Sequence, residues 1–289
     1  MKIFLSGVEG KQVEKPLRDI VATKGKLHYN LMSFYYIKPS NAEYVEWIIK
    51  NSEQILIDSG AHSFQFGKKV NWVEYTESYA QWIKDNDRSN IIGYFEMDIE
   101  NIIGYDKVKE LRKILEAATD KIIPVWHPDR GIHDYEDMCK QYKGKVIAIG
   151  GFRGTDIKDE QFLSFVKVAR KYNCKVHCLG MTRAKVLDKV PFDFTDSSTW
   201  LQETNFGKII FHKGKKRLPR AKGKDKENQL KLNYLQGMKM QEHYYNSYEK
   251  SKKSRRKKCQ LKKSKADIDT EQKAKHIKAK QKQKNKAEQ

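Results

Sequence analysis

The sequence is poor in cysteine and has no long hydrophobic run. It contains four cysteines and no CxxC pair: Cys139, Cys174, Cys178 and Cys259. Without closely spaced thiols, no single loop can present several thiolates to a zinc ion, so we expect no structural zinc. No apolar run approaches the length of a membrane span, and the apolar part of MKIFLSGVEG is too short for a signal peptide. We therefore predict a protein of a reducing cytoplasm with no membrane partner.

Two kinds of ligand-binding fingerprint are also missing. The stretch SGVEGK, which follows the first apolar run, has neither the GxGxxG spacing of a dinucleotide site nor the GxxxxGK spacing of a P-loop. The sequence has no HExxH motif and no cluster of histidines. We therefore predict no cofactor and no bound metal, while a metal held by carboxylates alone stays open as an alternative.

Basic charge is concentrated at one end of the sequence. The chain of 289 residues has a formal net charge of +21, and residues 213–289 hold 27 Lys and Arg against 8 Asp and Glu, a net of +19. Residues 1–212 hold 31 basic and 29 acidic side chains, a net of +2. A basic block next to a nearly neutral body is typical of a solvated segment that binds nucleic acid. An anionic membrane surface is the rival partner, but the segment lacks a strong apolar face to anchor it.

This charge step predicts two domains, a globular body at 1–212 and a basic C-terminal extension at 213–289. Lys213–Lys226 is rich in lysine and glycine and is interpreted as a linker. Gln229–Tyr248 is a candidate helix, because part of its apolar residues fall on one face. Ser251–Gln289 has the low complexity of a disordered tail or a frayed helix.

Short apolar runs recur eight times in the body. They are Lys2–Ser6, Leu31–Ile37, Ile55–Asp58, Gly93–Asp98, Lys121–Trp126, Val146–Gly150, Lys175–Leu179 and Phe192–Thr195. Segments with helical periodicity or capping residues separate most of them, among them Asn41–Lys50, Trp72–Ile83, Asp106–Ala118 and Asp156–Tyr172. Alternating strands and helices predict an α/β fold with a parallel sheet, and eight strands favour a closed (β/α)8 barrel of the TIM type. An open doubly wound sheet is the alternative.

Acidic residues follow several of these runs. ILIDSG ends the third run at Asp58, YFEMDIE contains Glu96 and Asp98, and FDFTDSS contains Asp193 and Asp196. In a parallel barrel the carboxyl ends of all strands meet in one mouth, so these acids are expected to converge. Two carboxylates in different surroundings can divide the roles of nucleophile and proton donor, which suits displacement at an anomeric carbon.

The glycine pair Gly150-Gly151 ends another of the runs. Without Cβ atoms its backbone can approach a flat ligand closely, and Asp98 could accept hydrogen bonds from the amino-imino edge of such a base. Each feature also has a purely structural interpretation, because a strand-end Asp can cap a helix and Gly-Gly can simply end a strand. The functional interpretation depends on the recurrence of polar residues at the same end of successive strands.

DSGAHSFQ at Asp58–Gln65 resembles the DSGGFQ signature of the queuine/archaeosine tRNA-guanine transglycosylase superfamily. The motifs that follow are similar in order: YFEMDIE, PVWH, IGGF, HCLGMT and FDFTDSS. The resemblance covers about residues 1–211. It implies that Asp196 is the nucleophile and Asp58 the general acid/base. Asp98 would read the guanine edge, with His127 in the place of the family's glutamine. The matched residues expected to bind substrate are Asp98, His127, Gly150, Gly151, Ser59, Met181 and Asp193.

The sequence also departs from the family pattern. The residues Ala61-His62-Ser63 interrupt the first motif, and no CxCxxC…H zinc motif follows Phe211. In lacking the zinc motif and in its compact length, this sequence resembles the phage and bacterial DNA-guanine transglycosylases, which insert 7-deazaguanine bases into DNA. The resemblance thus implies a pentosyltransferase of queuosine-like chemistry that exchanges guanine for a preQ0- or preQ1-type base. For a phage-encoded chain, the expected location is the host cytoplasm.

Three other functions stay open. A tRNA-guanine transglycosylase shares the chemistry, although its zinc motif is absent. A non-catalytic barrel could bind nucleic acid and use the acids only as helix caps. A metal-dependent hydrolase or nuclease would use Asp58, Asp98, Asp193 and Asp196 as ligands. The partners we expect are DNA ahead of tRNA and a 7-deazaguanine base, with a second copy of the chain in a homodimer as a further candidate.

Overall fold

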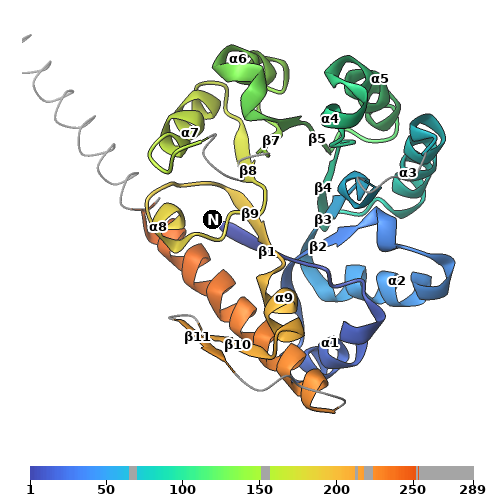
Figure 1. Ribbon diagram of the computed structural model, residues 1–289, viewed down its shortest axis with the longest axis vertical. Helices are drawn as coiled ribbons and strands as arrows, with labels where there is room; N and C mark the ends of the chain where they lie inside the picture. The colour runs from blue at the N-terminus through green and yellow to red at the C-terminus, as the bar shows by residue number, and fades with distance from the viewer. Residues whose placement is uncertain (65–69, 151–156, 212–213, 218–223, 252, 254–289) are drawn as a thin grey trace, which may run out of the picture. The chain divides into compact units, whose positions relative to one another are not determined.

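The computed structural model describes residues 1–64, 70–150, 157–211, 214–217, 224–251 and 253, and it contains the predicted barrel (Figure 1). Nine parallel strands of the described chain form one sheet in the order β5-β4-β3-β2-β1-β9-β8-β7-β6. They are β1 (Lys2–Ser6), β2 (Leu27–Ser33), β3 (Ser52–Asp58), β4 (Ile91–Phe95), β5 (Ile122–Ile123), β6 (Val125–Trp126), β7 (Val146–Ile149), β8 (Lys175–Cys178) and β9 (Phe194–Ser197). The sheet curves into a nearly closed ring with helices outside it, which confirms the predicted TIM-type α/β fold.

Pro124 divides one strand of the barrel into β5 and β6. Proline has no N–H to donate, and the half before it pairs with β4 while the half after it pairs with β7. On one side Glu96 N donates to Ile123 O at 3.1 Å, and on the other Ala148 N donates to Pro124 O at 2.9 Å. Because a single residue joins β5 to β6, the two ends of the sheet meet there. The nine strand segments therefore correspond to the eight strands that the sequence predicts.

Helices follow the strands and cover the outside of the barrel. The main ones are α1 (Lys11–Lys24), α2 (Ala42–Asn51), α3 (Trp72–Asn86), α5 (Tyr105–Glu116), α6 (Gly131–Gln141) and α7 (Phe162–Lys171). Shorter helical segments are α4 (Glu100–Ile103), α8 (Ala184–Leu187), α9 (Thr199–Asn205), η1 (Phe34–Tyr36), η2 (Pro39–Asn41), η3 (Ala61–Phe64) and η4 (Pro128–Arg130). In α3, the N-cap Asn71 accepts a hydrogen bond from Glu74 N at 3.4 Å, and Tyr79 is buried against the sheet.

Two apolar layers fill the body. The inner layer lies inside the ring of strands and consists of Phe4, Tyr29, Leu31, Leu56, Phe95, Ile123, Val125, Ala148 and Phe194. The outer layer lies between the strands and helices and includes Leu5, Ile57 and Ile20. Neighbouring residues of one strand, such as Phe4 and Leu5, belong to different layers because successive side chains of a strand face opposite sides. The packed centre leaves the ends of the barrel as the place for a ligand.

The second strand and some helices differ from the sequence prediction. The strand is Leu27–Ser33 and not Leu31–Ile37, because the aromatic residues after Ser33 form the 3-10 turn η1. In that turn Phe34 stacks on Tyr79 of α3 at a ring distance of 4.8 Å. Helices α1 and α6 are not among those that the periodicity singles out. The predicted start of the helix at Asp156 lies outside the described residues, and α7 begins at Phe162.

The compact unit that contains the barrel runs from Met1 to Tyr244, so the domain boundary predicted at 212 lies inside it. The segment interpreted as a linker contains β11 (Gly214–Arg217), which pairs antiparallel with β10 (Lys208–Phe211). A helix begins at residue 224 and continues to the end of this unit. The barrel unit is therefore larger than the charge distribution predicts.

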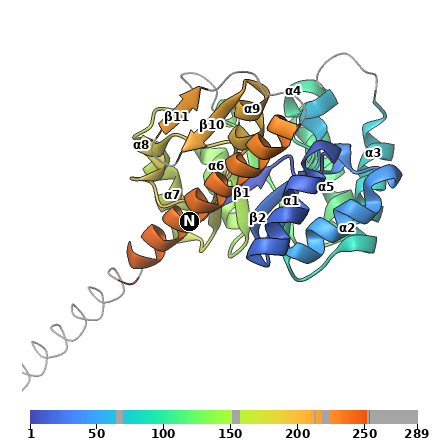
Figure 2. The same cartoon turned by 90° about the horizontal axis from the view of Figure 1, so that it is seen from below.

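The helix of residues 224–244 covers the barrel on the outside of β1 and β2 (Figure 2, orange). Tyr234 OH donates to Asn30 Oδ1 at 2.7 Å, and Gln241 Nε2 donates to Ile3 O at 2.8 Å and to Tyr29 O at 2.6 Å. Gly237 allows the close approach, since a Cβ there would lie 2.8 Å from a methyl group of Leu5. Buried polar contacts of this kind identify the helix as part of the barrel's own packing.

Tyr245–Gln289 forms a second unit, of which residues 245–251 and 253 are described and helical. The remainder of the segment predicted to be disordered lies outside the described residues. None of the described helices is both long enough and apolar enough to cross a membrane.

Candidate active site

The predicted site residues lie mainly at the carboxyl ends of the parallel strands, which we call the barrel mouth. Asp58 is the last residue of β3, and Asp196 lies in the second half of β9. Asp98 follows β4 by three residues, and His127 and Gly150 directly follow β6 and β7. Parallel pairing of all these strands places the five residues at the same end of the barrel.

Asp196 is held by three donors. Gly180 N donates to Oδ1 at 2.8 Å, and His177 Nε2 lies 2.9 Å from the same oxygen. The other oxygen, Oδ2, accepts a longer bond from the hydroxyl of Ser6 at 3.4 Å. Because an ionised carboxylate can only accept, a hydrogen bond to an ionised Asp196 requires the His177 tautomer with its hydrogen on Nε2. The arrangement fixes the carboxylate through Oδ1 and leaves Oδ2 with a single, longer hydrogen bond among the described residues, that from Ser6.

His177 is a functional candidate that the sequence analysis did not select. It is fully buried inside the barrel, with its ring 5.0 Å from that of Phe95 and 6.3 Å from that of Phe4. Its Nδ1 is buried and has no hydrogen-bond partner among the described residues. In the sequence His177 is the central residue of VHC. Because side chains alternate between the two faces of a strand, His177 points to the face opposite to that of Val176 and Cys178. An imidazole that is buried among aromatic rings and bonded to Asp196 can set the direction of that carboxylate.

Asp58 is half-buried at the mouth. Gly60 N donates to its Oδ2 at 3.1 Å. Burial, followed by the negative charges of Asp98 and Asp196, raises the pKa of Asp58 to about 7. Gly60 has a φ of +74°, and a Cβ there would lie 2.3 Å from Tyr35 Cβ, so the turn after Asp58 requires glycine. A carboxyl group with a pKa near neutrality can both give and take a proton.

Asp98 and His127 form a hydrogen-bonded pair, in which His127 Nε2 lies 2.5 Å from Asp98 Oδ1. Burial lowers the pKa of His127, but the hydrogen bond and charge of Asp98 outweigh burial and raise it overall. Gly150 supports the pair, because a Cβ at this position would lie 3.2 Å from the His127 ring. With 27% of its side chain exposed against 11% for His127, Asp98 is the more accessible member of the pair.

Other predicted site residues are placed differently. Asp193 precedes β9 at the opposite end of the barrel, where it accepts a hydrogen bond from Val176 N at 2.8 Å and pairs with Arg170 at 2.7 Å. Ser59 directly follows β3 and Met181 follows β8 by three residues, and their side chains are 0% and 1% exposed. Gly151 lies outside the described residues. The structure thus separates Asp193 from Asp196, although both belong to FDFTDSS.

Glu96 and Asp98 also have different environments, although both belong to YFEMDIE. Glu96 is buried and accepts hydrogen bonds from Arg112 Nε and from Val125 N, each at 2.5 Å. The second bond secures the strand just after Pro124. Glu96 is therefore a structural acid. Among the described residues, no group of three or more His, Cys, Asp or Glu side chains is arranged to hold a metal ion.

Glu9 and Ser33 are additional polar residues at the mouth that the sequence analysis did not select. Glu9 is 3% exposed and lies in the loop after β1. Ser33 ends β2 and pairs in register with Asp58. The signal for Glu9 was its position in SGVEGK, where an acid follows the first apolar run just as Asp58 follows the third.

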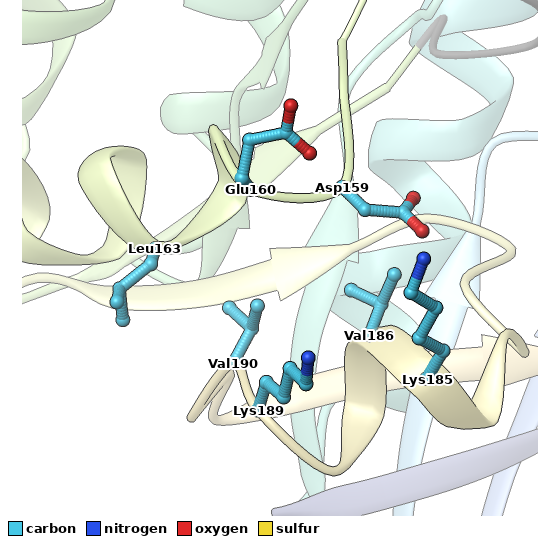
Figure 3. A pocket seen from close by; sticks show the side chains of 7 residues that line it. All are labelled: Asp159, Glu160, Leu163, Lys185, Val186, Lys189 and Val190. Carbon is cyan, nitrogen blue, oxygen red and sulfur yellow. The ribbon is translucent and has the colours of Figure 1, made fainter.

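A cavity of about 350 Å³ lies between the start of α7 and α8 (Figure 3). Its lining residues are Asp159, Glu160, Leu163, Lys185, Val186, Lys189 and Val190. The mouth acids do not line it. This cavity therefore plays no part in the site built from Asp58, Asp98 and Asp196.

A scan against protein-family models gives no match to this chain, and a search of curated proteins gives none either. Among solved structures, a protein from Coccidioides immitis assigned as a fructose-1,6-biphosphate aldolase is similar, with 9% identity, a TM-score of 0.52, and coverage of 83% of this chain and 89% of that chain. A mutant tryptophan synthase alpha-subunit from Pyrococcus furiosus has 14% identity and a TM-score of 0.43 over 81% and 96% of the two chains. A mandelate racemase/muconate lactonizing protein from Herpetosiphon aurantiacus has 11% identity and a TM-score of 0.40 over 69% and 55%. At these identities the likeness to the first structure establishes the fold alone: the chain has a TIM-type barrel.

Proposed function

We propose that this protein is an enzyme, a guanine transglycosylase that exchanges guanine in a polynucleotide for a 7-deazaguanine base such as preQ0 or preQ1. The family resemblance of the sequence supplies the reaction. The observation that carries the proposal is the placement of Asp58, Asp98 and Asp196 on different strands at one mouth, with the pKa of Asp58 near 7. Three acids with three different environments suit the three roles of proton transfer, base recognition and attack.

Asp196 is the nucleophile of the proposed reaction. Its Oδ2 attacks C1′ of the target nucleotide, the bond from C1′ to the guanine nitrogen breaks, and the leaving base takes a proton from Asp58. The incoming base then gives a proton to Asp58 and attacks C1′, which releases Asp196. Two displacements at the same carbon retain the sugar configuration. Since C1′ of a stacked nucleotide is inaccessible, the substrate is a flipped or single-stranded nucleotide.

Asp98 and His127 are proposed to recognise the base. Asp98 keeps one oxygen for the His127 bond and can use the other to accept from the amino-imino edge of guanine. Arg130 stabilises this region, because it pairs with Glu100 at 2.9 Å just after the Asp98 strand end. The edge that Asp98 reads is shared by guanine and 7-deazaguanines, so one pocket serves both the leaving and the incoming base.

The polynucleotide is proposed to be DNA ahead of tRNA. The missing zinc motif argues against the tRNA enzymes, and the net charge of +19 in residues 213–289 suits phosphate contacts that are independent of sequence. A metal-dependent hydrolase stays the second candidate because of the number of acids. The described residues do not arrange them as a metal site, which disfavours that candidate.

The proposal is tested by incubating the protein with radiolabelled guanine and separate pools of DNA and tRNA. We expect the DNA pool to gain label, with the reaction unaffected by EDTA. Asp196→Asn is expected to abolish incorporation, while Asp193→Asn serves as the matched control from the same motif. Label in tRNA alone would transfer the proposal to the tRNA enzymes. Absence of label in both pools, with a folded protein, would refute the exchange reaction.

A further inference from the structure

Glu9 is a buried acid that the proposed reaction does not yet use. Its loop is held in place, since Asn41 Nδ2 donates to Glu9 O at 3.3 Å and Tyr44 OH donates to Val8 O at 3.0 Å. The side chain is 3% exposed, so it has almost no contact with water. Fixed backbone and near-complete burial mean that the carboxyl group must find its partners within the protein.

Those partners are too few for an ionised carboxylate. Besides a contact with its own backbone N–H, the Glu9 carboxyl group accepts one long hydrogen bond, from Ser33 N to Oε1 at 3.4 Å, and Oε2 is buried with no partner in the described part of the chain. Burial is the largest cause that raises the pKa of Glu9, backbone hydrogen bonds lower it, and the like charge of Asp58 adds a smaller increase. A buried carboxylate without a cation costs several kcal/mol. The neutral form of Glu9 is therefore favoured whenever Asp58 is ionised.

Ser33 places Glu9 and Asp58 next to each other. Its N–H donates to Glu9, while its backbone pairs in register with Asp58. Gly60, whose N–H donates to Asp58, lies so near that a Cβ on it would be 2.7 Å from Ser33 Oγ. That hydroxyl is itself buried and has no partner within the described ranges. Glu9 and Asp58 are thus both neighbours of Ser33, whose own hydroxyl group is unbonded.

We infer that Glu9 and Asp58 are a coupled acid pair that holds one proton between its two members at neutral pH. The catalytic consequence rests on the proposed function, whereas the pairing is a property of the free protein. Glu9 would be a positioning residue, because it acts on the substrate only through Asp58. Burial is the largest cause that raises the pKa of each of the two acids to about 7, so both carboxyl groups titrate in the same pH range.

The other titratable groups near the pair are acids and phenols. Asp98 and Asp196 act on Asp58 from the neighbouring strand ends, with His127 bonded to Asp98. Tyr75 and Tyr79 of α3 lie near Asp58, and Tyr44 of α2 lies near Glu9. Burial raises the pKa of each of these tyrosines further, so they stay neutral between pH 5 and pH 8. The proton of the pair is thus left to the carboxyl groups.

The pairing is tested first in the free protein, by a double-mutant cycle of Glu9→Gln and Asp58→Asn. An acid whose pKa is raised on folding stabilises the fold at low pH, and this stabilisation is lost as pH rises from about 4.5 to about 7. We expect each variant to reduce the loss of unfolding free energy between pH 5 and pH 8. Either change alone removes the repulsion between the two acids. The double variant should therefore recover less unfolding free energy at pH 8 than the sum of the two single variants. Additive effects would overturn the inference.

The second test measures the pH dependence of exchange. Glu9→Gln removes a like charge next to Asp58. The high-pH limb of the pH–rate profile, where Asp58 loses its proton, should therefore move to lower pH by roughly one unit. Glu9→Asp should restore part of the shift. Glu203→Gln is the matched control, because Glu203 is also buried, at 8% exposure, but lies on α9. An unmoved limb in Glu9→Gln would contradict the inference. If no polymer is exchanged at all, the proposed function fails, and the first test still decides the pairing.

Discussion

The three mouth acids differ in the partners that hold them, and this difference suits the three roles that we propose for them. Asp196 has Oδ1 occupied by two donors, and Asp98 has Oδ1 occupied by His127. Asp58 has the backbone N–H of Gly60 on Oδ2 and lies under the negative charges of the other two acids. A fixed carboxylate suits attack, a carboxylate paired with imidazole suits recognition, and a carboxyl group of raised pKa suits proton transfer.

Asp58→Asn is expected to lower the rate of exchange by ~10²-fold or more, in the range found for general acid–base groups. Asparagine keeps the size of the side chain but can neither give nor take the proton. Single-turnover rates at pH 7 measure the effect, and circular dichroism checks the fold. A rate within threefold of the wild type would remove Asp58 from the acid/base role.

Asp98→Ala is expected to relax base choice more than it slows the reaction of the preferred base. The change removes the acceptor for the amino-imino edge and leaves His127 without its bonded partner. Competition between guanine and hypoxanthine, which lacks the amino group, measures this selectivity. A mutant with the same preference as the wild type would show that Asp98 does not read the base.

Some of these positions follow from the sequence and some do not. Asp58 and Asp98 could be predicted because each follows an apolar run, and a parallel barrel collects such ends. Asp193 and Asp196 are three residues apart in one motif, and only the observed bounds of β9 show that they lie at opposite ends of a strand. The positions of Glu9 and His177 had a signal in the sequence, but their burial and their atoms without a hydrogen-bond partner in the described chain could be found only from coordinates.

At the level of the elements, the strand divided by Pro124 determines how the barrel closes. Val125 N would lack a strand partner next to the proline, and Glu96 supplies the acceptor at 2.5 Å. Glu96 also pairs with Arg112 of α5, which ties the strand to the outer layer. The apolar residues of this segment predicted the strand. The sequence did not indicate that the Glu96 side chain would replace a backbone carbonyl as the acceptor for Val125 N.

Glu96→Gln is expected to destabilise the fold by about 3–5 kcal/mol, because it leaves Arg112 buried without its counter-ion. Urea unfolding of the free protein measures the change. Glu46→Gln is the control, since Glu46 forms a bidentate pair with Arg88 on the surface, where such pairs contribute ~1 kcal/mol or less. Equal effects of the two variants would show that the Glu96 pair does not secure the strand.

At the level of the whole molecule, the compact unit extends beyond the point at which the charge changes. The charge changes near residue 213, but the compact unit continues to Tyr244. One face of the helix of residues 224–244, which carries both polar and apolar side chains, packs on β1 and β2. Lysines on the solvent side of that helix contribute to the net charge without separating it from the barrel. Burial, and not charge, defines the unit.

Two truncated proteins test this border. A protein that ends at Tyr244 lacks 17 Lys and Arg and 5 Asp and Glu, and it should keep its thermal stability. The salt dependence of its DNA binding should become shallower, by about 0.9 log units for each phosphate that the shortened chain no longer neutralises. A protein that ends at 212 should lose stability, because the hydrogen bonds of Tyr234 and Gln241 disappear. An unchanged salt slope after removal of residues 245–289 would show that the Lys-rich end does not bind DNA.

The proposed reaction requires that Asp196 becomes covalently bonded to the sugar during exchange. Wild-type protein is mixed with a short guanine-containing DNA oligonucleotide at low salt, quenched in acid, digested and mapped by mass spectrometry. We expect a glycosylated peptide with the adduct on Asp196, trapped in larger amount when no incoming base is present. This peptide should be absent in Asp196→Asn. An adduct on Asp193, or exchange that proceeds in Asp196→Asn at the wild-type rate, would contradict it.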